Sequence, residues 1–103
     1  MLLRGISMNL NNLLKTNRIE ILKIAAKHGA SNVRVFGSLA RDEATEDSDI
    51  DFLVEFDKNI SLFDHAALII ELQEFLGCKV DVVSINGIKP RILDRVLKEA
   101  IAL

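Results

Sequence analysis

Residues 49–56, DIDFLVEF, alternate between two kinds of side chain, and this alternation constrains the fold more than any other stretch of the sequence. Successive side chains of a β-strand point to opposite faces, so the segment predicts a strand with one core face. Asp49 and Asp51 are then predicted to share the other face, together with Leu53 and Glu55. The apolar positions that predict the core face are Ile50, Phe52, Val54 and Phe56.

Two shorter segments predict further strands. The first is NVRVFG at 32–37, and the second is KVDVVS at 79–84. In the second, Asp81 and Val83 are expected on one face of the strand, and Val80 and Val82 on the other. A third acid is therefore predicted beside an otherwise apolar strand.

Helices are predicted between the strands, where apolar residues recur at helical spacing. They are expected over 11–28, over a short stretch that starts at Ser38, over 61–76 and from Pro90 onward. The dense apolar residues of 61–76 predict a largely buried helix. The order of elements predicts an α/β (α+β) fold, in which helices pack with a small mixed sheet of about three strands.

Length and composition set the frame for this fold. A chain of 103 residues predicts one domain over 1–103, in which residues 1–10 match no periodic element and either Met1 or Met8 is the start. The net charge of −2 argues against direct nucleic-acid binding. One cysteine, Cys78, and no membrane-length apolar segment predict a cytoplasmic protein that is not bound to a membrane. Since half of the residues are hydrophobic, another chain could cover some apolar surface in a homo- or hetero-oligomer.

The paired aspartates suggest a cation site. Strand geometry puts the Cβ atoms of Asp49 and Asp51 about 6.6 Å apart, and two like charges at that distance favour a cation between them. Mg²⁺ prefers such oxygen ligands and leaves room for phosphates. Asp81 would complete the site if its strand lies beside that of Asp51. The alternative is that the acids face solvent or pair with nearby bases, namely Arg34, Arg41 or Lys79.

A Gly-Ser turn precedes the aspartates. Gly37 and Ser38 follow a predicted strand and begin a predicted helix, so backbone N–H groups are expected to face an incoming phosphate. Arg41 lies one helical turn further and could also reach a phosphate. The alternative is that Ser38 only caps the helix. Because the segment from Arg41 to Asp57, both included, holds eight acids, binding of a nucleoside triphosphate is expected to require Mg²⁺.

Taken together, these residues resemble the nucleotidyltransferase superfamily of DNA polymerase β. The resemblance is carried by Gly37-Ser38, Arg41, Ser48-Asp49-Ile50-Asp51 and Asp81. The size of the chain and its tail IKPRILDRVLKEAIAL look most like the minimal nucleotidyltransferases (MNT) that are the antitoxins of HEPN-domain toxins. The resemblance covers roughly residues 15–103. It departs from the family at Asp42, where such proteins commonly have glycine.

The resemblance implies Mg²⁺-dependent transfer of AMP from ATP to a hydroxyl, in the MNT family a tyrosine of the HEPN toxin. It assigns two metal ions to Asp49, Asp51 and Asp81, and to Asp81 also a part in deprotonating the acceptor. It assigns nucleotide binding to Gly37, Ser38, Arg41 and Ser48.

Two other functions remain open at this stage. The protein could mask a toxin by binding alone, or it could transfer a nucleotide to a small molecule. The presence of all three acids favours catalysis over binding alone, because a pure binding protein has no need of converging carboxylates. The sequence does not specify the nucleotide, the number of nucleotides transferred, the acceptor or the oligomeric state.

Overall fold

The computed structural model describes residues 10–37, 39–40 and 49–103. Most of the segment expected to be irregular, residues 1–10, lies outside this part, and the first helix begins at Leu10. The short helix expected from Ser38 also falls largely outside it. The elements are α1 (Leu10–Thr16), α2 (Arg18–Lys27), β2 (Ala30–Phe36), β3 (Ile50–Phe56), α3 (Leu62–Leu76), β4 (Val80–Ser84), the 3₁₀ turn η1 (Ile85–Gly87), α4 (Pro90–Glu99) and β5 (Ile101–Ala102).

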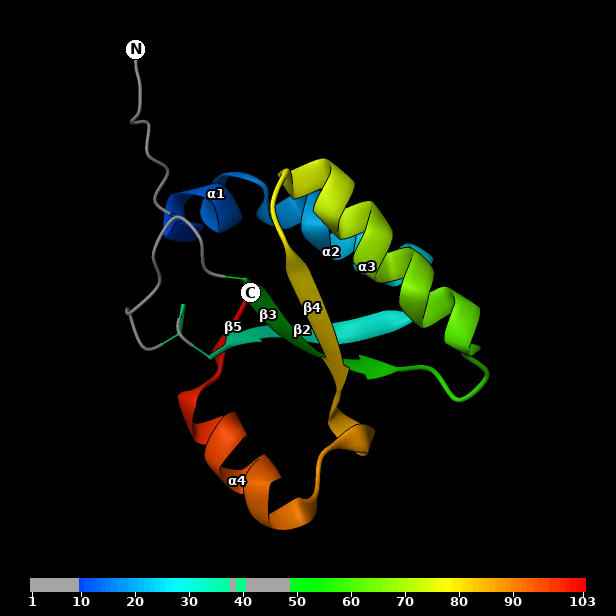
Figure 1. Cartoon of the computed structure of the whole chain (residues 1–103), viewed down its shortest axis with the longest axis vertical. Coiled ribbons are helices and arrows are strands. Elements are labelled where there is room, and N and C mark those ends of the chain that lie inside the picture. Colours follow the sequence, from blue (N-terminus) through cyan, green and yellow to red (C-terminus); the bar gives the residue numbers. More distant parts are fainter. Residues whose placement is uncertain (1–9, 38, 41–48) are drawn as a thin grey trace.

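The sheet is mixed, as predicted, with the strand order β4-β3-β2-β5 (Figure 1). β3 pairs with β2 antiparallel and with β4 parallel. The predicted α+β fold is therefore confirmed. The prediction of about three strands missed β5, which contributes two residues beside Arg34 and Val35. A strand this short is below the length at which alternation of side chains becomes visible in a sequence.

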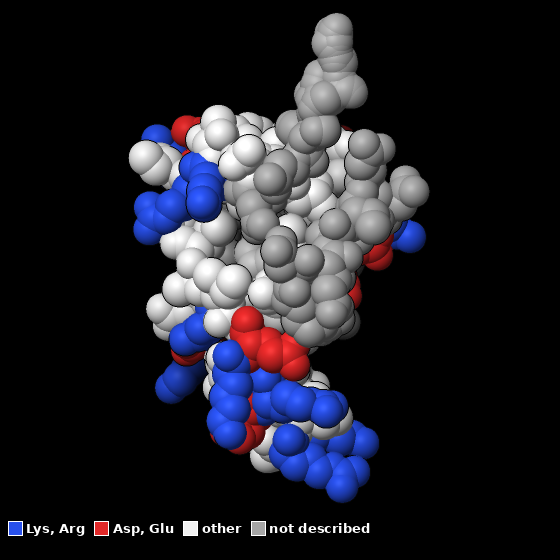
Figure 2. All heavy atoms as spheres, turned by 90° about the vertical axis from the view of Figure 1, so that its left-hand side faces the viewer, with Lys and Arg blue, Asp and Glu red and all other residues white. Residues whose placement is uncertain are grey.

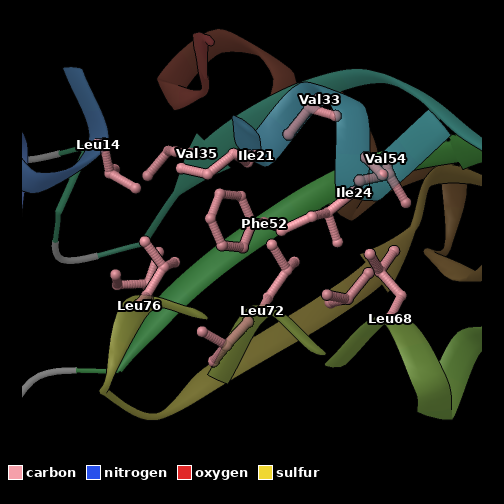
Figure 3. Close-up of a cluster of buried hydrophobic side chains, with 14 of the residues drawn as sticks. Leu14, Ile21, Ile24, Val33, Val35, Phe52, Val54, Leu68, Leu72 and Leu76 are labelled. Atoms are coloured by element: carbon pink, nitrogen blue, oxygen red, sulfur yellow. The ribbon is translucent and has the colours of Figure 1, made fainter. Parts of the chain in front are cut away.

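The core lies between the sheet and the helices α1, α2 and α3, which cover one face (Figure 1). Phe52 is fully buried at its centre, surrounded by side chains from both layers (Figure 3). The predicted core face of β3 is confirmed, because Ile50, Phe52 and Val54 are at most 1% exposed. Leu53 points to the opposite face and is also fully buried, so that face is not simply open to solvent.

The single helix expected over 11–28 is two helices, which meet at Asn17. The Asn17 side chain donates to the Leu13 carbonyl at 2.8 Å, the same oxygen that its backbone N–H contacts at 3.1 Å. A short amide side chain that binds a nearby carbonyl competes with continuation of the helix. The break changes which residues are buried: Ile21 and Ile24 face the core, while Ile19 is 64% exposed.

α3 begins and ends where the sequence predicts, but it is not largely buried. Ser61 Oγ accepts from the Asp64 N–H at 3.2 Å, and Gly77 ends the helix at a φ of 71°. Leu68, Leu72 and Leu76 are buried, whereas Phe63 is 86% exposed and Ile70 is 54% exposed. The prediction is wrong because α3 lies in an outer layer, where only one face meets the sheet.

α4 lies on the side of the sheet away from α2 and α3 (Figure 1). It starts at Pro90, as predicted, but none of its residues is fully buried. Figure 2 shows that Lys and Arg side chains gather at this end of the molecule. The exposed bases of this segment are Lys89, Arg91, Arg95 and Lys98. No helix in the described ranges is long and apolar enough to span a membrane.

An ion-pair cluster joins α2 to α3. Lys27 Nζ lies 2.7 Å from one oxygen of Glu71, and His28 Nε2 lies 2.8 Å from the other. The hydrogen bond from Lys27, and then that from His28, holds the pKa of Glu71 below its ordinary value. A depressed folded-state pKa stabilises the fold above the unfolded pKa, and this stabilisation is lost as the pH falls through the folded value.

We therefore expect Glu71→Gln to lower the free energy of unfolding at pH 7. The difference from the parent should shrink as the pH falls below about 4, where the unfolded-state glutamate becomes protonated. Urea titrations at pH 7, 5 and 3 measure this effect. Glu74→Gln, the next acid on α3, is the control and should show a smaller dependence on pH. A Glu71→Gln difference that is the same at all three pH values would contradict the assignment.

Candidate active site

Asp51 and Asp81 lie side by side in the sheet. They are direct partners in the parallel register of β3 and β4, so the condition set by the sequence, that the strand of Asp81 adjoins that of Asp51, is met. Adjacent strands lie about 4.8 Å apart, and side chains paired in register leave the sheet on the same face. Asp51 is half-buried and Asp81 is exposed. The pair therefore presents two carboxylates that a single ligand can reach.

Gly37, at the end of β2, lies beside Asp51 on the other side of β3 from Asp81. Its neighbour Phe36 is the antiparallel partner of Asp51, and Gly37 follows at the end of the strand with a φ of 75°. A Cβ atom at Gly37 would overlap the Oδ2 atom of Asp51. The backbone of Gly37 thus lies directly against the carboxylate of Asp51. Only glycine combines this clearance with a positive φ at little cost.

Asp49, where the predicted strand begins, lies just outside β3. It precedes β3, which begins at Ile50, and it is exposed. Burial raises the pKa of the Cys78 thiol, and the negative charge of the Asp49 carboxylate raises this pKa further. That Asp49 and Asp51 point the same way stays a prediction.

The carboxylates of Asp51 and Asp81 are candidate ligands for a divalent cation. Within residues 10–37, 39–40 and 49–103, no three His, Cys, Asp or Glu side chains already converge as a metal cluster. The donor set nevertheless fits Mg²⁺, because Asp51 and Asp81 are hard oxygen ligands in register and Mg²⁺ usually takes one or two carboxylates plus substrate phosphates. Asp49 is the nearest further carboxylate in the sequence.

Three of the predicted nucleotide-binding residues, Ser38, Arg41 and Ser48, lie outside the described residues. The same is true of Asp42, the departure from the family pattern. Their roles stay predictions. Of the predicted site, the structure brings together Gly37, Asp51 and Asp81.

Sequence reasoning missed two side chains that hold the strand of Asp81. Gln73 Oε1 accepts from the Val80 N–H at 3.2 Å, and His65 Nε2 lies 2.7 Å from the Val82 carbonyl oxygen. Both come from α3. Neither residue belongs to a motif, so nothing in the sequence distinguishes them from ordinary polar positions on a helix.

Comparison with known proteins decides the family. Residues 18–103 match the model of the nucleotidyltransferase domain. The chain belongs to this family. It is therefore an enzyme of the nucleotidyltransferase class, and Asp51 and Asp81 occupy neighbouring strands of a nucleotidyltransferase domain.

Several proteins are similar to this one over most of both chains. Putative protein adenylyltransferase MJ0435 of Methanocaldococcus jannaschii is 46% identical over 91% of this chain and 97% of its own. Protein adenylyltransferase MntA of Thermococcus cleftensis is 38% identical over 77% of this chain and 80% of its own. A solved structure of a putative minimal nucleotidyltransferase superposes with a TM-score of 0.84 at 50% identity, covering 93% of this chain and 97% of that one.

A more distant structure shares the fold. It is a complex of a tri-AMPylated HEPN toxin of Shewanella oneidensis with an MNT antitoxin, and it matches with a TM-score of 0.65 at 19% identity. The match covers 85% of this chain and 69% of that chain. At this identity the likeness shows a common fold alone.

Proposed function

We propose that this nucleotidyltransferase transfers AMP from ATP to a hydroxyl, in the first place a tyrosine, of a partner HEPN-domain toxin, and that it thereby acts as an antitoxin. The register of Asp51 with Asp81 carries the proposal, because it gives a nucleotidyltransferase domain two adjacent carboxylates for a phosphate-bound cation. The names of the similar chains MJ0435 and MntA, both protein adenylyltransferases, support a protein as acceptor.

The reaction needs few groups from the protein. The acceptor oxygen attacks the α-phosphorus of ATP, the bond to the bridging oxygen of the β-phosphate breaks, and pyrophosphate leaves with the electron pair. Bound Mg²⁺, proposed as two ions, would stabilise charge on the attacking and leaving oxygens. Asp49 and Asp51 would hold these ions, and Asp81 would ligate one of them and help to remove the proton of the acceptor hydroxyl. Gly37 and Ser38, with Arg41 and Ser48, hold the phosphates.

The surface offers contacts for a protein acceptor. Leu62 and Phe63 are each 86% exposed at the start of α3, and exposed Lys and Arg side chains gather at α4. Exposed apolar side chains and arginines are both common in protein-binding surfaces.

The test is transfer of label from ATP. The purified protein is incubated with Mg²⁺, the protein encoded by the neighbouring gene, and ATP labelled at either the α- or the γ-phosphate. We expect α-label on the partner, no γ-label, loss of transfer with EDTA, and loss when the acceptor tyrosine is changed to phenylalanine. Label on a metabolite without a partner would instead indicate a small-molecule substrate.

The second candidate function is inhibition by binding alone. The exposed side chains of Leu62, Phe63 and Ile70 favour it, because they suit a stable complex whether or not transfer occurs. The double variant Asp49→Asn with Asp51→Asn separates the two. Full toxin inhibition by this variant, with no label transfer by the parent, would overturn the enzymatic proposal.

A further inference from the structure

The outer edge of β4 needs partners for its backbone. Among the described strands, β4 is the last of the sheet on its side, and it carries Asp81. The Ile50 N–H donates to the Lys79 carbonyl at 3.0 Å, so the backbone groups of Lys79 and Asp81 face β3. Alternate residues of a strand direct their backbone groups to opposite sides. Those of Val80 and Val82 therefore face away from β3.

Two side chains of α3 bind this outer edge on either side of Asp81. Gln73 accepts from the N–H of Val80, and His65 lies at hydrogen-bond distance from the carbonyl of Val82. Since a carbonyl oxygen can only accept, the hydrogen of this bond is on Nε2 of His65. The ring of His65 also packs against Phe56 with 5.0 Å between centroids. The edge of β4 is thus fixed to a helix both before and after Asp81.

We propose that Gln73 and His65 are positioning residues for Asp81: by holding the edge of β4, they keep Asp81 in register with Asp51. This inference rests on the proposed role of the two aspartates in binding a divalent cation. Neither side chain touches the reacting atoms. Their influence is exerted through the backbone at Val80 and Val82, the residues that flank Asp81 in the strand.

Catalytic geometry makes such support important. Misplacement of a catalytic group by about 1 Å can reduce a rate about 100-fold. Asp81 is the second residue of β4, which has β3 as its one strand neighbour within the described part of the chain, so the other side of β4 has no strand there. The α3 contacts supply the second side. A cation shared between Asp51 and Asp81 would therefore be bound less tightly when these contacts are removed.

The test measures Mn²⁺ binding by electron paramagnetic resonance, together with hydrogen exchange of the Val80 amide. Gln73→Leu removes the acceptor, and we expect Mn²⁺ affinity to fall about tenfold, the lower end for loss of a supporting contact around a metal site. The Val80 amide should exchange faster. Gln73→Glu keeps an acceptor oxygen and should retain the parent affinity. Glu74→Leu places the same new side chain one residue further along α3 and is the matched control.

His65 supplies an independent variant in case Gln73→Leu fails to fold. His65→Phe keeps a ring beside Phe56 but loses the N–H, and we expect a similar loss of Mn²⁺ affinity. His65→Gln can place an amide N–H near the position of Nε2 and should restore it. Unchanged Mn²⁺ affinity in both Gln73→Leu and His65→Phe would overturn the proposal.

A double-mutant cycle shows whether Gln73 acts through Asp81. In an Asp81→Asn background, Gln73→Leu should have no further effect on Mn²⁺ affinity, because coupled positions are not additive. A full additional loss there, or an Asp81→Asn variant that binds Mn²⁺ as well as the parent, would contradict the assignment. These measurements need no ATP and no acceptor. Failure of label transfer would therefore overturn the proposed function without deciding this inference.

Discussion

Asp51→Asn is expected to reduce AMP transfer about 1,000-fold or more, equivalent to about 4 kcal/mol of lost transition-state stabilisation. The reason is that the change keeps the shape of the side chain but removes the charge that attracts the cation. Asp51 has the most constrained position of the three aspartates, between Asp81 on β4 and the backbone of Gly37. The measurement is the rate of α-label transfer under saturating ATP and Mg²⁺.

Glu55→Gln is the matched control for this change. Glu55 is an acid on the same face of β3, four residues further along, and accepts from Asn32 Nδ2 at 2.6 Å. A glutamine keeps an oxygen for that bond, so transfer should stay within about twofold of the parent.

The melting temperature distinguishes loss of cation binding from loss of the fold. Mg²⁺ should raise the melting temperature of the parent and of Glu55→Gln but not that of Asp51→Asn, since a ligand stabilises only the state that binds it. Equal transfer by Asp51→Asn and the parent would refute the assigned role.

The sequence alone was sufficient to predict those features of the fold that depend on a local pattern of residues. The alternation in 49–56 predicted the buried face of β3, and Ser61 and Gly77 bounded α3 correctly because capping depends on neighbouring residues alone. The break at Asn17 was missed because a side-chain bond to a carbonyl competes with the helix without changing the apolar spacing. The exposure of Phe63 was missed because it depends on how many layers the whole domain has.

The same distinction applies to the site. The placement of Asp51 and Asp81 on neighbouring strands, and of Gly37 at the end of β2, could be predicted, because an acid within an apolar strand and a glycine after a strand are both visible in the sequence. Gln73 and His65 could not, because their significance comes from contact between α3 and the edge of β4. The local basic character of α4 was likewise hidden by the net charge of −2 over the whole chain. Net charge therefore says little about what each face of this protein attracts.

Gly37→Ala is expected to reduce transfer about 100-fold, because a catalytic carboxylate is displaced. Alanine at a φ of 75° adopts a left-handed backbone that costs about 1 kcal/mol. In addition, the new Cβ would overlap Oδ2 of Asp51, so either the carboxylate or the turn must move. Both the phosphate turn and the cation ligand would be disturbed by one methyl group. The rate of α-label transfer and the affinity for Mn²⁺ measure the two consequences.

Gly77→Ala separates the effect of backbone strain from that of the displaced carboxylate. Gly77 has nearly the same φ, 71°, but a Cβ built there meets no atom within 4 Å among the described residues. The two variants should therefore lose similar backbone stability in urea titrations, about 1 kcal/mol each, while only Gly37→Ala should lose transfer and Mn²⁺ affinity. If Gly77→Ala lost as much transfer as Gly37→Ala, strain alone would explain the effect. Contact between Gly37 and the Asp51 carboxylate would then have no special part in the chemistry.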